Sequence, residues 1–538
     1  PRTMGVLQPM TFIGLIGISR LFVRFMLVEF APRDGAEQSV MIYGAGRAGQ
    51  QLTLSLRHEP HIKVVGYLDD DPRLFGQRVD GMIIHNPARL SDLLHVRPVD
   101  EILLALPTAS RERRRQIIEF IQSLDVHVRS LPTASDMLSG EVTFDDLREV
   151  EIEDLLGRDA IPPNDMLMER NIRGKVVLVT GAGGSIGSEL SRQILKVGPR
   201  RLVLLDRSEF ALYSIGEELK RVARRSDAAP PTLVLGDVTD EKFVRRTMMD
   251  IAPETVFHVA AYKHVPLIED NIVSGVFNNV AGTLNCAISA EECGTGSFVL
   301  VSTDKAVRPT NVMGASKRVC ELIVEARGNM ETATVFSMVR FGNVLGSSGS
   351  VVPLFKEQIR AGGPLTLTDR HVTRYFMTIP EAAQLVIQAC SLAKGGDVFV
   401  LDMGEPVKII DLAEALIGLS GRTVRSEENP EGDIEIVETG LRPGEKAYEE
   451  LFLGDIIERT PHPRITRAQD GHSHWNDIVA PLDQLILASR EGNELVVLTI
   501  LQNLVEGYIP TCQATERQFS RDAIKSSPAF DRSQFNVG

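Results

Sequence analysis

Cysteine is scarce in this sequence. The 538 residues contain five cysteines, which are Cys286, Cys293, Cys320, Cys390 and Cys512. They show neither CxxC spacing nor the density of a disulfide scaffold, so we expect free thiols in a reducing compartment. No cluster of His, Cys and Asp has the spacing of a metal site either, and no metal is predicted.

Basic residues are in deficit. The chain has 58 Lys and Arg against 72 Asp and Glu, which gives a net charge of -14. This sign argues against general nucleic-acid binding, so any anionic ligand must be held by a local site. The length and the apolar content of 43% predict about two to three globular domains.

A long, uninterrupted apolar run is also missing. The nearest is TFIGLIGISRLFVRFMLVEF, residues 11–30, which contains Arg20 and Arg24. About twenty residues span a bilayer, and arginine near one end of a membrane helix can snorkel and marks the cytoplasmic side. The chain starts at Pro1 like the broken end of something longer. We therefore expect residues 1–37 to be the end of a membrane anchor and a linker; an amphipathic helix lying on its own protein is the alternative.

Two stretches begin with an apolar strand that runs into a glycine-rich turn and then a helical pattern, as in a dinucleotide-binding fold. The first, SVMIYGAGRAGQQL, supplies Gly44, Gly46 and Gly49, and VVGYLDDDP and EILLALP follow as strands. Few other functional groups accompany these glycines, which favours a structural or vestigial nucleotide fold. If a nucleotide binds, Asp69 is the expected ribose contact. The stretch predicts a Rossmann-like domain over residues 38–135.

The second glycine-rich turn, TGAGGSIG, follows the strand VVLVT and supplies Gly181, Gly184 and Gly187. The three glycines are expected to allow a tight turn, close approach to a pyrophosphate, and close packing of helix on sheet. Ser185 and Ile186 begin the helix, whose N-terminus then faces the phosphates. This turn is the stronger of the two predictions of a nucleotide site.

Acidic residues after the next two strands support a bound dinucleotide. RLVLLD ends at Asp206, where a carboxylate accepts the ribose hydroxyls of NAD, and LVLGDVTD places Asp237 and Val238 beside the adenine. Arg207 could pair with the extra phosphate of NADP, so NAD is predicted and NADP remains an alternative. Each carboxylate alone could equally cap a turn or a helix.

The remaining boundaries follow from composition. Residues 136–170, which include Pro162, Pro163 and many charges, predict a connector with a short helix. Alternating strand and helix patterns continue over residues 171–510. The tail, residues 511–538, is rich in Ser, Gln, Arg and Asp without apolar periodicity, and is expected to be disordered. The fold class predicted is α/β with two Rossmann-like, doubly wound parallel sheets.

Three segments carry a family resemblance: TVFHVAAYKHVPLIE, FVLVSTDKAVRPTNVMGASKRVCE and VRFGNVLGSSGSVVPLF. They resemble the extended short-chain dehydrogenase/reductases, and more narrowly the bacterial membrane-anchored UDP-N-acetylglucosamine 4,6-dehydratases of capsule, O-antigen and protein-glycan synthesis. The resemblance covers about residues 10–510. It implies a first domain similar to CoA-binding domains and a second domain with a smaller C-terminal substrate-binding part. It also implies cofactor contacts at Ala260 and Ala261.

The catalytic residues depart from the superfamily's usual pattern. The usual lysine of YxxxK is Lys317, which also holds the nicotinamide ribose, but Met313 replaces the tyrosine and cannot accept a proton. Alone, this would indicate an inactive binding module. Against it stand Thr303, Asp304 and Lys305, where glucose-nucleotide 4,6-dehydratases carry Thr, Asp and Glu. Lysine for glutamate is the pattern of the membrane-anchored enzymes, of which one subgroup also has methionine for tyrosine; an exposed ion pair beginning a loop is the alternative interpretation.

The resemblance implies a cycle without net oxidation. Hydride passes from C4 of the hexose to NAD(P)+, a proton leaves C5, water leaves C6, and hydride returns to C6. Lys305 would be the base at C5 if its pKa is lowered by burial or a neighbouring cation. Asp304, protonated, would be the acid at the C6 oxygen, and Thr303 would hydrogen-bond the C4 oxygen. Water or one of these groups must accept the proton of the C4 hydroxyl.

Further residues are expected to bind a UDP-sugar, here UDP-N-acetylglucosamine. Asn343 and Ser350 match the family region that cradles the nucleotide diphosphate, and Arg442 and Glu445 match its pyrophosphate and ribose contacts. Lys263 and His264 are expected near the sugar. His264 is expected to be a hydrogen-bonding wall residue, and Arg374 a phosphate contact.

Two other functions stay open. A C4 epimerase shares the first hydride step but needs no acid and base at C6 and C5. A non-catalytic nucleotide-binding scaffold would explain Met313 and the second Rossmann unit. For the dehydratase we expect a homo-oligomer at the bacterial inner membrane, with its catalytic domain in the cytoplasm.

Overall fold

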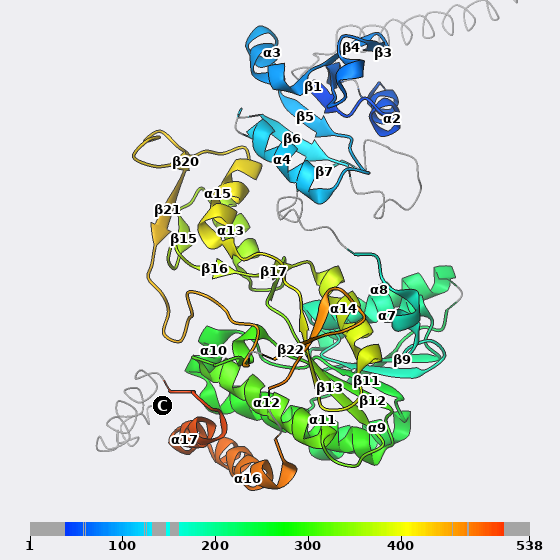
Figure 1. Ribbon diagram of the computed structural model, residues 1–538, viewed down its shortest axis with the longest axis vertical. Helices are drawn as coiled ribbons and strands as arrows, with labels where there is room; N and C mark the ends of the chain where they lie inside the picture. Colours follow the sequence, from blue (N-terminus) through cyan, green and yellow to red (C-terminus); the bar gives the residue numbers. More distant parts are fainter. Residues whose placement is uncertain are drawn as a thin grey trace, which may run out of the picture. The chain divides into compact units, whose positions relative to one another are not determined.

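A computed structural model describes residues 38–131 apart from 58, 60, 123 and 125, residues 147–150, and residues 161–510 apart from 227, 455, 471 and 472. The chain forms two compact units that divide between residues 151 and 152. Each unit is an α/β assembly (Figure 1). The predicted fold class, two Rossmann-like units with parallel sheets, is confirmed.

The first unit holds a seven-stranded sheet in the order β3-β4-β2-β1-β5-β6-β7. Its elements are β1 (Gln38–Tyr43), α2 (Arg47–Leu56), β2 (Ile62–Leu68), η1 (Pro72–Leu74), β3 (Arg78–Val79), β4 (Met82–His85), η2 (Pro87–Arg89), α3 (Leu90–Val96), β5 (Glu101–Leu104), α4 (Arg111–Gln122), β6 (His127–Ser130) and β7 (Arg148–Glu149). Strands β2, β1, β5 and β6 are parallel, whereas β7 pairs antiparallel with β6. The first sheet thus continues past residue 135.

The core of this unit packs β1, α2 and β5 together. Val40, Ile42, Leu52 and Leu103 are fully buried there. None of the helices in the described ranges has the length and apolar character needed to cross a bilayer. The predicted membrane segment, residues 11–30, lies outside the described residues.

The second unit is built on a nine-stranded sheet in the order β10-β9-β8-β11-β12-β13-β18-β23-β22. Its first half consists of α6 (Asp165–Glu169), β8 (Val176–Thr180), α7 (Ser185–Val197), β9 (Arg201–Asp206), α8 (Glu209–Ser226), β10 (Thr232–Leu235), α9 (Glu241–Ile251), β11 (Thr255–His258), α10 (Val265–Asp270), α11 (Ile272–Glu292), β12 (Ser297–Val301), η4 (Asp304–Ala306), α12 (Val312–Gly328) and β13 (Val335–Arg340). The seven strands from β10 to β18 are parallel. The chain order reverses between β8 and β11, so ligands are expected beyond the carboxyl ends of these two strands.

The second half adds a smaller lobe within residues 343–459, called the substrate-side lobe because the sequence predicts substrate contacts there, and the last helices. Its elements are β14 (Asn343–Val344), α13 (Val351–Arg360), β15 (Leu365–Leu367), β16 (Thr373–Arg374), β17 (Phe376–Met377), α14 (Ile379–Leu392), β18 (Asp397–Leu401), β19 (Val407–Lys408), α15 (Ile409–Leu419), β20 (Val424–Arg425), β21 (Ile434–Glu438), β22 (Ile457–Arg459), β23 (Ile465–Ala468), α16 (Trp475–Glu491) and α17 (Glu494–Leu504). β22 and β23 extend the main sheet antiparallel. A separate sheet, β15-β21-β20, packs with α13 and α15 around Phe355, Leu412 and Ile434.

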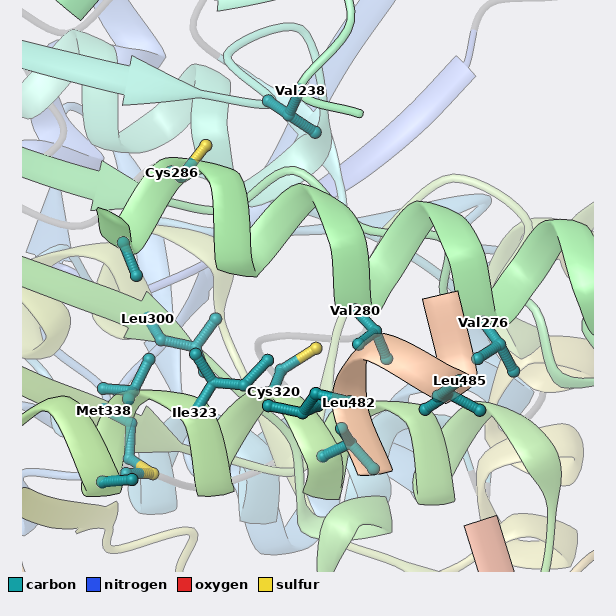
Figure 2. Close-up of a cluster of buried hydrophobic side chains, with 14 of the residues drawn as sticks. Val238, Val276, Val280, Cys286, Leu300, Cys320, Ile323, Met338, Leu482 and Leu485 are labelled. Atoms are coloured by element: carbon teal, nitrogen blue, oxygen red, sulfur yellow. The ribbon is translucent and has the colours of Figure 1, made fainter. Parts of the chain in front are cut away.

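Apolar side chains cover both faces of the main sheet. Helices α7, α8 and α14 pack on one face, and α9, α11 and α12 pack on the other. Helices α16 and α17 lie against α11 and α12 (Figure 1). Figure 2 shows Leu482 and Leu485 of α16 beside Val276 and Val280 of α11 and Cys320 of α12. Because every residue of β8 is buried, as in parallel strands covered on both faces, the glycine loop after it has a rigid support.

Candidate active site

The glycine loop after β8 has room only for glycine at two predicted positions. Gly181 has φ +67°, and a Cβ there would lie 2.6 Å from the backbone nitrogen of Ala260. A Cβ on Gly187 would lie 2.0 Å from the carbonyl oxygen of Gly181. Helix α7 starts at Ser185 after Gly184, and no side chain caps its N-terminus. A tight turn therefore leads to free helical N–H groups, the arrangement that receives a pyrophosphate.

Asp206 ends β9 beside this loop. Its Oδ2 accepts a hydrogen bond from the backbone N–H of Gly183 at 2.8 Å, and its Oδ1 accepts one from Ser208 at 2.8 Å. In the first unit, Asp69 accepts a hydrogen bond from Ala45 in the same way, at 2.8 Å. Both carboxylates thus support their own glycine loops from the end of the second strand. Each oxygen retains a lone pair for a further donor.

Arg207 is occupied by neighbours rather than free. Its guanidinium lies 4.6 Å above the ring of Tyr262, 3.5 Å from Asp237 Oδ2 and 3.4 Å from Asn278 Oδ1. Asp237 Oδ1 also accepts hydrogen bonds from Thr239. Asp237 therefore compensates part of the charge of Arg207.

A cavity of about 770 Å³ extends from the glycine loop past the ends of β11 and β12 to the substrate-side lobe. Most of the predicted site residues line it: Gly181, Gly184, Ser185, Ile186, Asp206, Arg207, Val238, Ala260, Ala261, Lys263, His264, Thr303, Lys305, Met313, Lys317, Asn343, Ser350, Arg374, Arg442 and Glu445. Gly187, Asp237 and Asp304 are not among the residues that line it. A cavity of about 440 Å³ adjoins it and shares Lys263, His264, Lys305, Arg374 and Glu445 with it.

The acid and base candidates follow β12 directly. Thr303 precedes η4, and its hydroxyl lies 2.9 Å from Asp304 Oδ1, to which it donates a hydrogen bond. Lys305 Nζ donates to the same oxygen at 3.1 Å. Asp304 is fully buried, and its Oδ2 has no hydrogen-bond partner among the described residues. A buried carboxylate oxygen without a donor is costly, so a donor that reached this atom would be bound favourably.

The pKa of Lys305 moves in the direction opposite to the one that the sequence analysis required. Burial lowers the pKa, but the charges of Asp304 and Glu449, together with the Asp304 hydrogen bond, outweigh burial and raise it. Arg374 is the neighbouring cation, and its effect is smaller. The condition set for Lys305 as a base, a lowered pKa, is therefore not met, because two carboxylates face its ammonium group.

Lys317 and Met313 lie on α12. Lys317 Nζ donates a hydrogen bond to the carbonyl oxygen of Val301 at 2.8 Å, and burial lowers its pKa. Met313 is buried and lines the cavity with Lys317. The side chain in the usual tyrosine position thus contributes a thioether and no acid or base.

On the substrate side, Asn343 Oδ1 accepts a hydrogen bond from Lys305 Nζ at 3.1 Å. Ser350 precedes α13, and its hydroxyl is buried without a hydrogen-bond partner among the described residues. Arg442 is exposed where it lines the larger cavity, and its backbone N–H donates a hydrogen bond to Glu445 Oε2 at 3.3 Å. These groups line one wall of the larger cavity.

Arg374 is paired with carboxylates rather than presented alone. Its Nη2 lies 3.1 Å from Glu445 Oε1, and its Nε lies 3.7 Å from Glu449 Oε1. Its Nη1 donates to the carbonyl oxygens of Thr373 and Ala447. Arg374 thus holds the loop that carries both glutamates next to the cavity. The sequence predicted a phosphate contact for Arg374 and gave no indication of these two ion pairs.

Lys263 and His264 stand between the two cavities. Burial lowers the pKa of Lys263. Burial, and then the charge of Lys263, lower the pKa of His264. A Cβ on Gly349 would lie 2.4 Å from the His264 ring, so the imidazole packs closely as a neutral wall group.

Glu449 belongs to the site but carries no signal in the sequence. It lies in a loop between β21 and β22, where an acidic residue is ordinarily solvated. Its side chain is only 4% exposed, and Oε1 lies 3.4 Å from Lys305 Nζ. Only the folded arrangement of the substrate-side lobe brings this loop to η4.

The fold and the site define a class: a dinucleotide-type Rossmann protein in which a lysine that lines the cavity, Lys305, is paired with the buried Asp304. No group of three or more His, Cys, Asp or Glu side chains within the described ranges is arranged to hold a metal. The polysaccharide biosynthesis protein family matches residues 177–470, and a CoA-binding domain family matches residues 9–132.

The chain is similar to several known proteins. The chain is 42% identical to capsular polysaccharide biosynthesis protein CapD of Staphylococcus aureus, over 88% of this chain and 78% of that protein. It is 34% identical to UDP-glucose 4-epimerase of Rickettsia bellii, over 53% of this chain and 80% of that protein. The structure of Pen from Bacillus thuringiensis is 32% identical with a TM-score of 0.50, and covers 56% of this chain and 92% of that one. The chain belongs to the polysaccharide biosynthesis protein family, and the family resemblance seen in the sequence is confirmed.

Proposed function

We propose that the second unit is an NAD-dependent UDP-N-acetylglucosamine 4,6-dehydratase, a lyase that forms a UDP-4-keto-6-deoxy-hexosamine for surface polysaccharide or glycan synthesis. The observation that carries the proposal is the ion pair between Lys305, which lines a cavity that begins at a dinucleotide-type glycine loop, and Asp304, which is fully buried with its Oδ1 3.1 Å from the Lys305 ammonium group. An epimerase needs no such acid and base, whereas elimination of water across C5 and C6 needs both.

The residues present fit a nicotinamide dinucleotide. Gly181, Gly187 and the uncapped start of α7 leave space and N–H donors for its pyrophosphate, Asp206 offers oxygens to its ribose, and Lys317 lies near the end of β12. When bound, the cofactor supplies the oxidation of C4 and the later reduction of C6. Everything else in the cycle is a matter of moving protons with the chain's own side chains.

The requirement that protons balance over the cycle gives each of these side chains a role at a particular step. Asp304, hydrogen-bonded from Thr303 at 2.9 Å, can take the proton of the C4 hydroxyl through the threonine hydroxyl, which replaces the missing tyrosine. Asp304 then gives this proton to the C6 oxygen, and water leaves. Lys305 removes the C5 proton, which the new C4 ketone acidifies, and returns a proton to C5 at the end. Atoms and charges then balance without an external reductant.

The test is an incubation of the protein with UDP-N-acetylglucosamine and NAD, followed by NMR of the products. The dehydratase proposal expects a 4-keto-6-deoxy sugar. A C4 epimer would instead favour the second candidate, which the 34% identity to a UDP-glucose 4-epimerase supports. No conversion under conditions where NAD binds would favour a non-catalytic scaffold.

The cofactor preference is a separate prediction. Because Asp206 faces the ribose position and Asp237 neutralises Arg207, we expect NAD to bind at least about tenfold more tightly than NADP. Titration of the purified protein with each oxidised cofactor, followed by calorimetry, measures the ratio. Equal or tighter binding of NADP would show that Arg207 leaves Asp237 to hold the phosphate.

We also propose that residues 11–30 tether the protein to the bacterial inner membrane, with the second unit on the cytoplasmic side where UDP-sugars are made, and that the enzyme is a homo-oligomer. The twenty largely apolar residues with two arginines motivate this localisation. Fractionation of cells that express the protein should place it in the membrane pellet, and removal of residues 1–37 should release it. Detergent-free recovery of the intact protein in the soluble fraction would contradict the tether.

A further inference from the structure

Lys305 must be a neutral amine to act as the base in the proposed cycle, and the inference rests on this proposed function. Its Nζ is within hydrogen-bond or ion-pair distance of three oxygens: Asp304 Oδ1 at 3.1 Å, Asn343 Oδ1 at 3.1 Å and Glu449 Oε1 at 3.4 Å. An ammonium group has three N–H donors and no acceptor. Three facing oxygens therefore stabilise the charged form, which has no lone pair with which to remove a proton from C5.

The proton of Lys305 must pass to a neighbour before the amine can act. Asn343 cannot accept a proton under these conditions, because a neutral amide is not a base. Asp304 receives the C4 hydroxyl proton in the proposed cycle and cannot also hold this one. Glu449 is the remaining carboxylate within reach, and Arg374 is the charged group on its other side.

Glu449 is suited to this task by its surroundings. Its side chain is 4% exposed, and it lines the smaller cavity with Lys305 and Arg374. Its Oε2 is buried and has no hydrogen-bond partner among the described residues. A sugar that fills the cavity removes water from the ion pair, and a desolvated pair of charges gains by becoming a neutral amine and a carboxylic acid.

We propose that Glu449 receives the ammonium proton of Lys305 when the sugar occupies the cavity, and so frees the amine to act as the base at C5. One N–H bond breaks and one O–H bond forms, with no change in total charge. The amine then takes the C5 proton and returns it after C6 is reduced, and Glu449 gives its proton back to Lys305. Glu449 acts through Lys305 and is a positioning residue for it.

The test compares Glu449→Gln, Glu449→Asp and Glu450→Gln in the full chain. Glutamine keeps the shape of Glu449 but cannot take a proton, whereas aspartate keeps the carboxylate. Glu450 is the matched control, because it is adjacent in sequence but 42% exposed and paired with Arg308 and Lys446. The readouts are kcat, KM, the pH dependence of kcat/KM, and the rate at which solvent deuterium enters C5.

At pH 7, kcat and C5 deuterium entry in Glu449→Gln should fall by about a hundredfold, the lower range of general acid–base effects. The activity should recover as the pH rises, because Lys305 then loses its proton to solvent before the sugar binds. Glu449→Asp should retain more activity than Glu449→Gln, and Glu450→Gln should match the unmodified protein. If Glu449→Gln does not fold, Glu449→Asp is judged by its C5 exchange rate and pH profile.

Three results would overturn the inference. Glu449→Gln could keep full activity at pH 7, could become more active there, or could lose activity with an unchanged pH profile and a raised KM. The first two would leave Glu449 as a group that merely keeps Lys305 charged, and the third would make it a structural anchor for Arg374. If the unmodified protein makes no 4-keto-6-deoxy sugar, the proposed function itself fails, and the variants are then not the cause.

Discussion

Lys305→Ala is expected to stop the reaction after C4 has been oxidised. Without the amine, the groups left around its position are the carboxylates of Asp304 and Glu449, the Asn343 amide and the Arg374 guanidinium, and the proposed cycle assigns none of them to the C5 proton. The protein should accumulate reduced cofactor and the 4-keto sugar. Solvent deuterium should fail to enter C5. Absorbance of the reduced nicotinamide and NMR of the bound sugar measure the two effects.

Met313→Ala is the control for this experiment. Met313 is buried beside Lys317 and lacks a proton to give or take, so its truncation should disturb packing and change turnover only modestly. Loss of all activity in Met313→Ala, with activity retained in Lys305→Ala, would show that the catalytic assignment is wrong and that the base lies elsewhere in the cavity.

Asp304→Asn should slow the loss of water from C6 by roughly two to four orders of magnitude, the usual effect of general acid catalysis. Asparagine keeps the shape and can still accept from Thr303 and Lys305, as Asp304 Oδ1 does at 2.9 and 3.1 Å. It cannot carry the C4 hydroxyl proton to the C6 oxygen. Pre-steady-state measurements of sugar oxidation and of water loss should show both steps slowed, with KM little changed.

A uniform rise in KM with kcat preserved would contradict this role for Asp304. It would mean that Asp304 helps to hold the sugar but moves no proton. Either substitution, Asp304→Asn or Lys305→Ala, changes the charge balance of a buried ion pair and could therefore destabilise the fold. Circular dichroism and thermal unfolding of both variants separate a loss of function from misfolding.

The parts of the site that follow strands of the parallel sheet could be predicted from the sequence. Gly181 and Gly187 could be predicted because only glycine fits at either position. Gly181 has a positive φ, and a Cβ on Gly187 would lie 2.0 Å from a backbone oxygen. Asp206 ends β9, and Thr303 follows β12. Both could be predicted as site residues, because parallel strands bring their carboxyl ends to one edge of the sheet. For these residues, the local sequence pattern and the topology of a parallel sheet were sufficient for the prediction.

Other features depend on contacts between distant loops, for which the sequence has no local signal. The direction of the pKa shift of Lys305 depends on Glu449, which arrives from the substrate-side lobe. The pairing of Arg374 with Glu445 and Glu449 likewise requires the folded lobe. Sequence analysis could identify charged residues in these loops, but whether they are solvated or paired is decided by tertiary packing.

The boundary of the first unit shows the same limit at the level of the fold. β7 has only two residues, Arg148–Glu149, and pairs antiparallel with β6. So short a strand has no apolar alternation that could mark it in the sequence. The antiparallel pair β22 and β23 at the far edge of the second sheet is similarly brief.

In the proposed reaction, one hydride moves within the hexose from C4 to C6 while Asp304 and Lys305 move protons. UDP-N-acetylglucosamine that carries deuterium at C4 tests this directly, with the product's NMR spectrum as the measurement. We expect a 4-keto-6-deoxy product with the deuterium on C6. Deuterium that remains on C4 of an epimerised sugar, or an unlabelled C6, would contradict it.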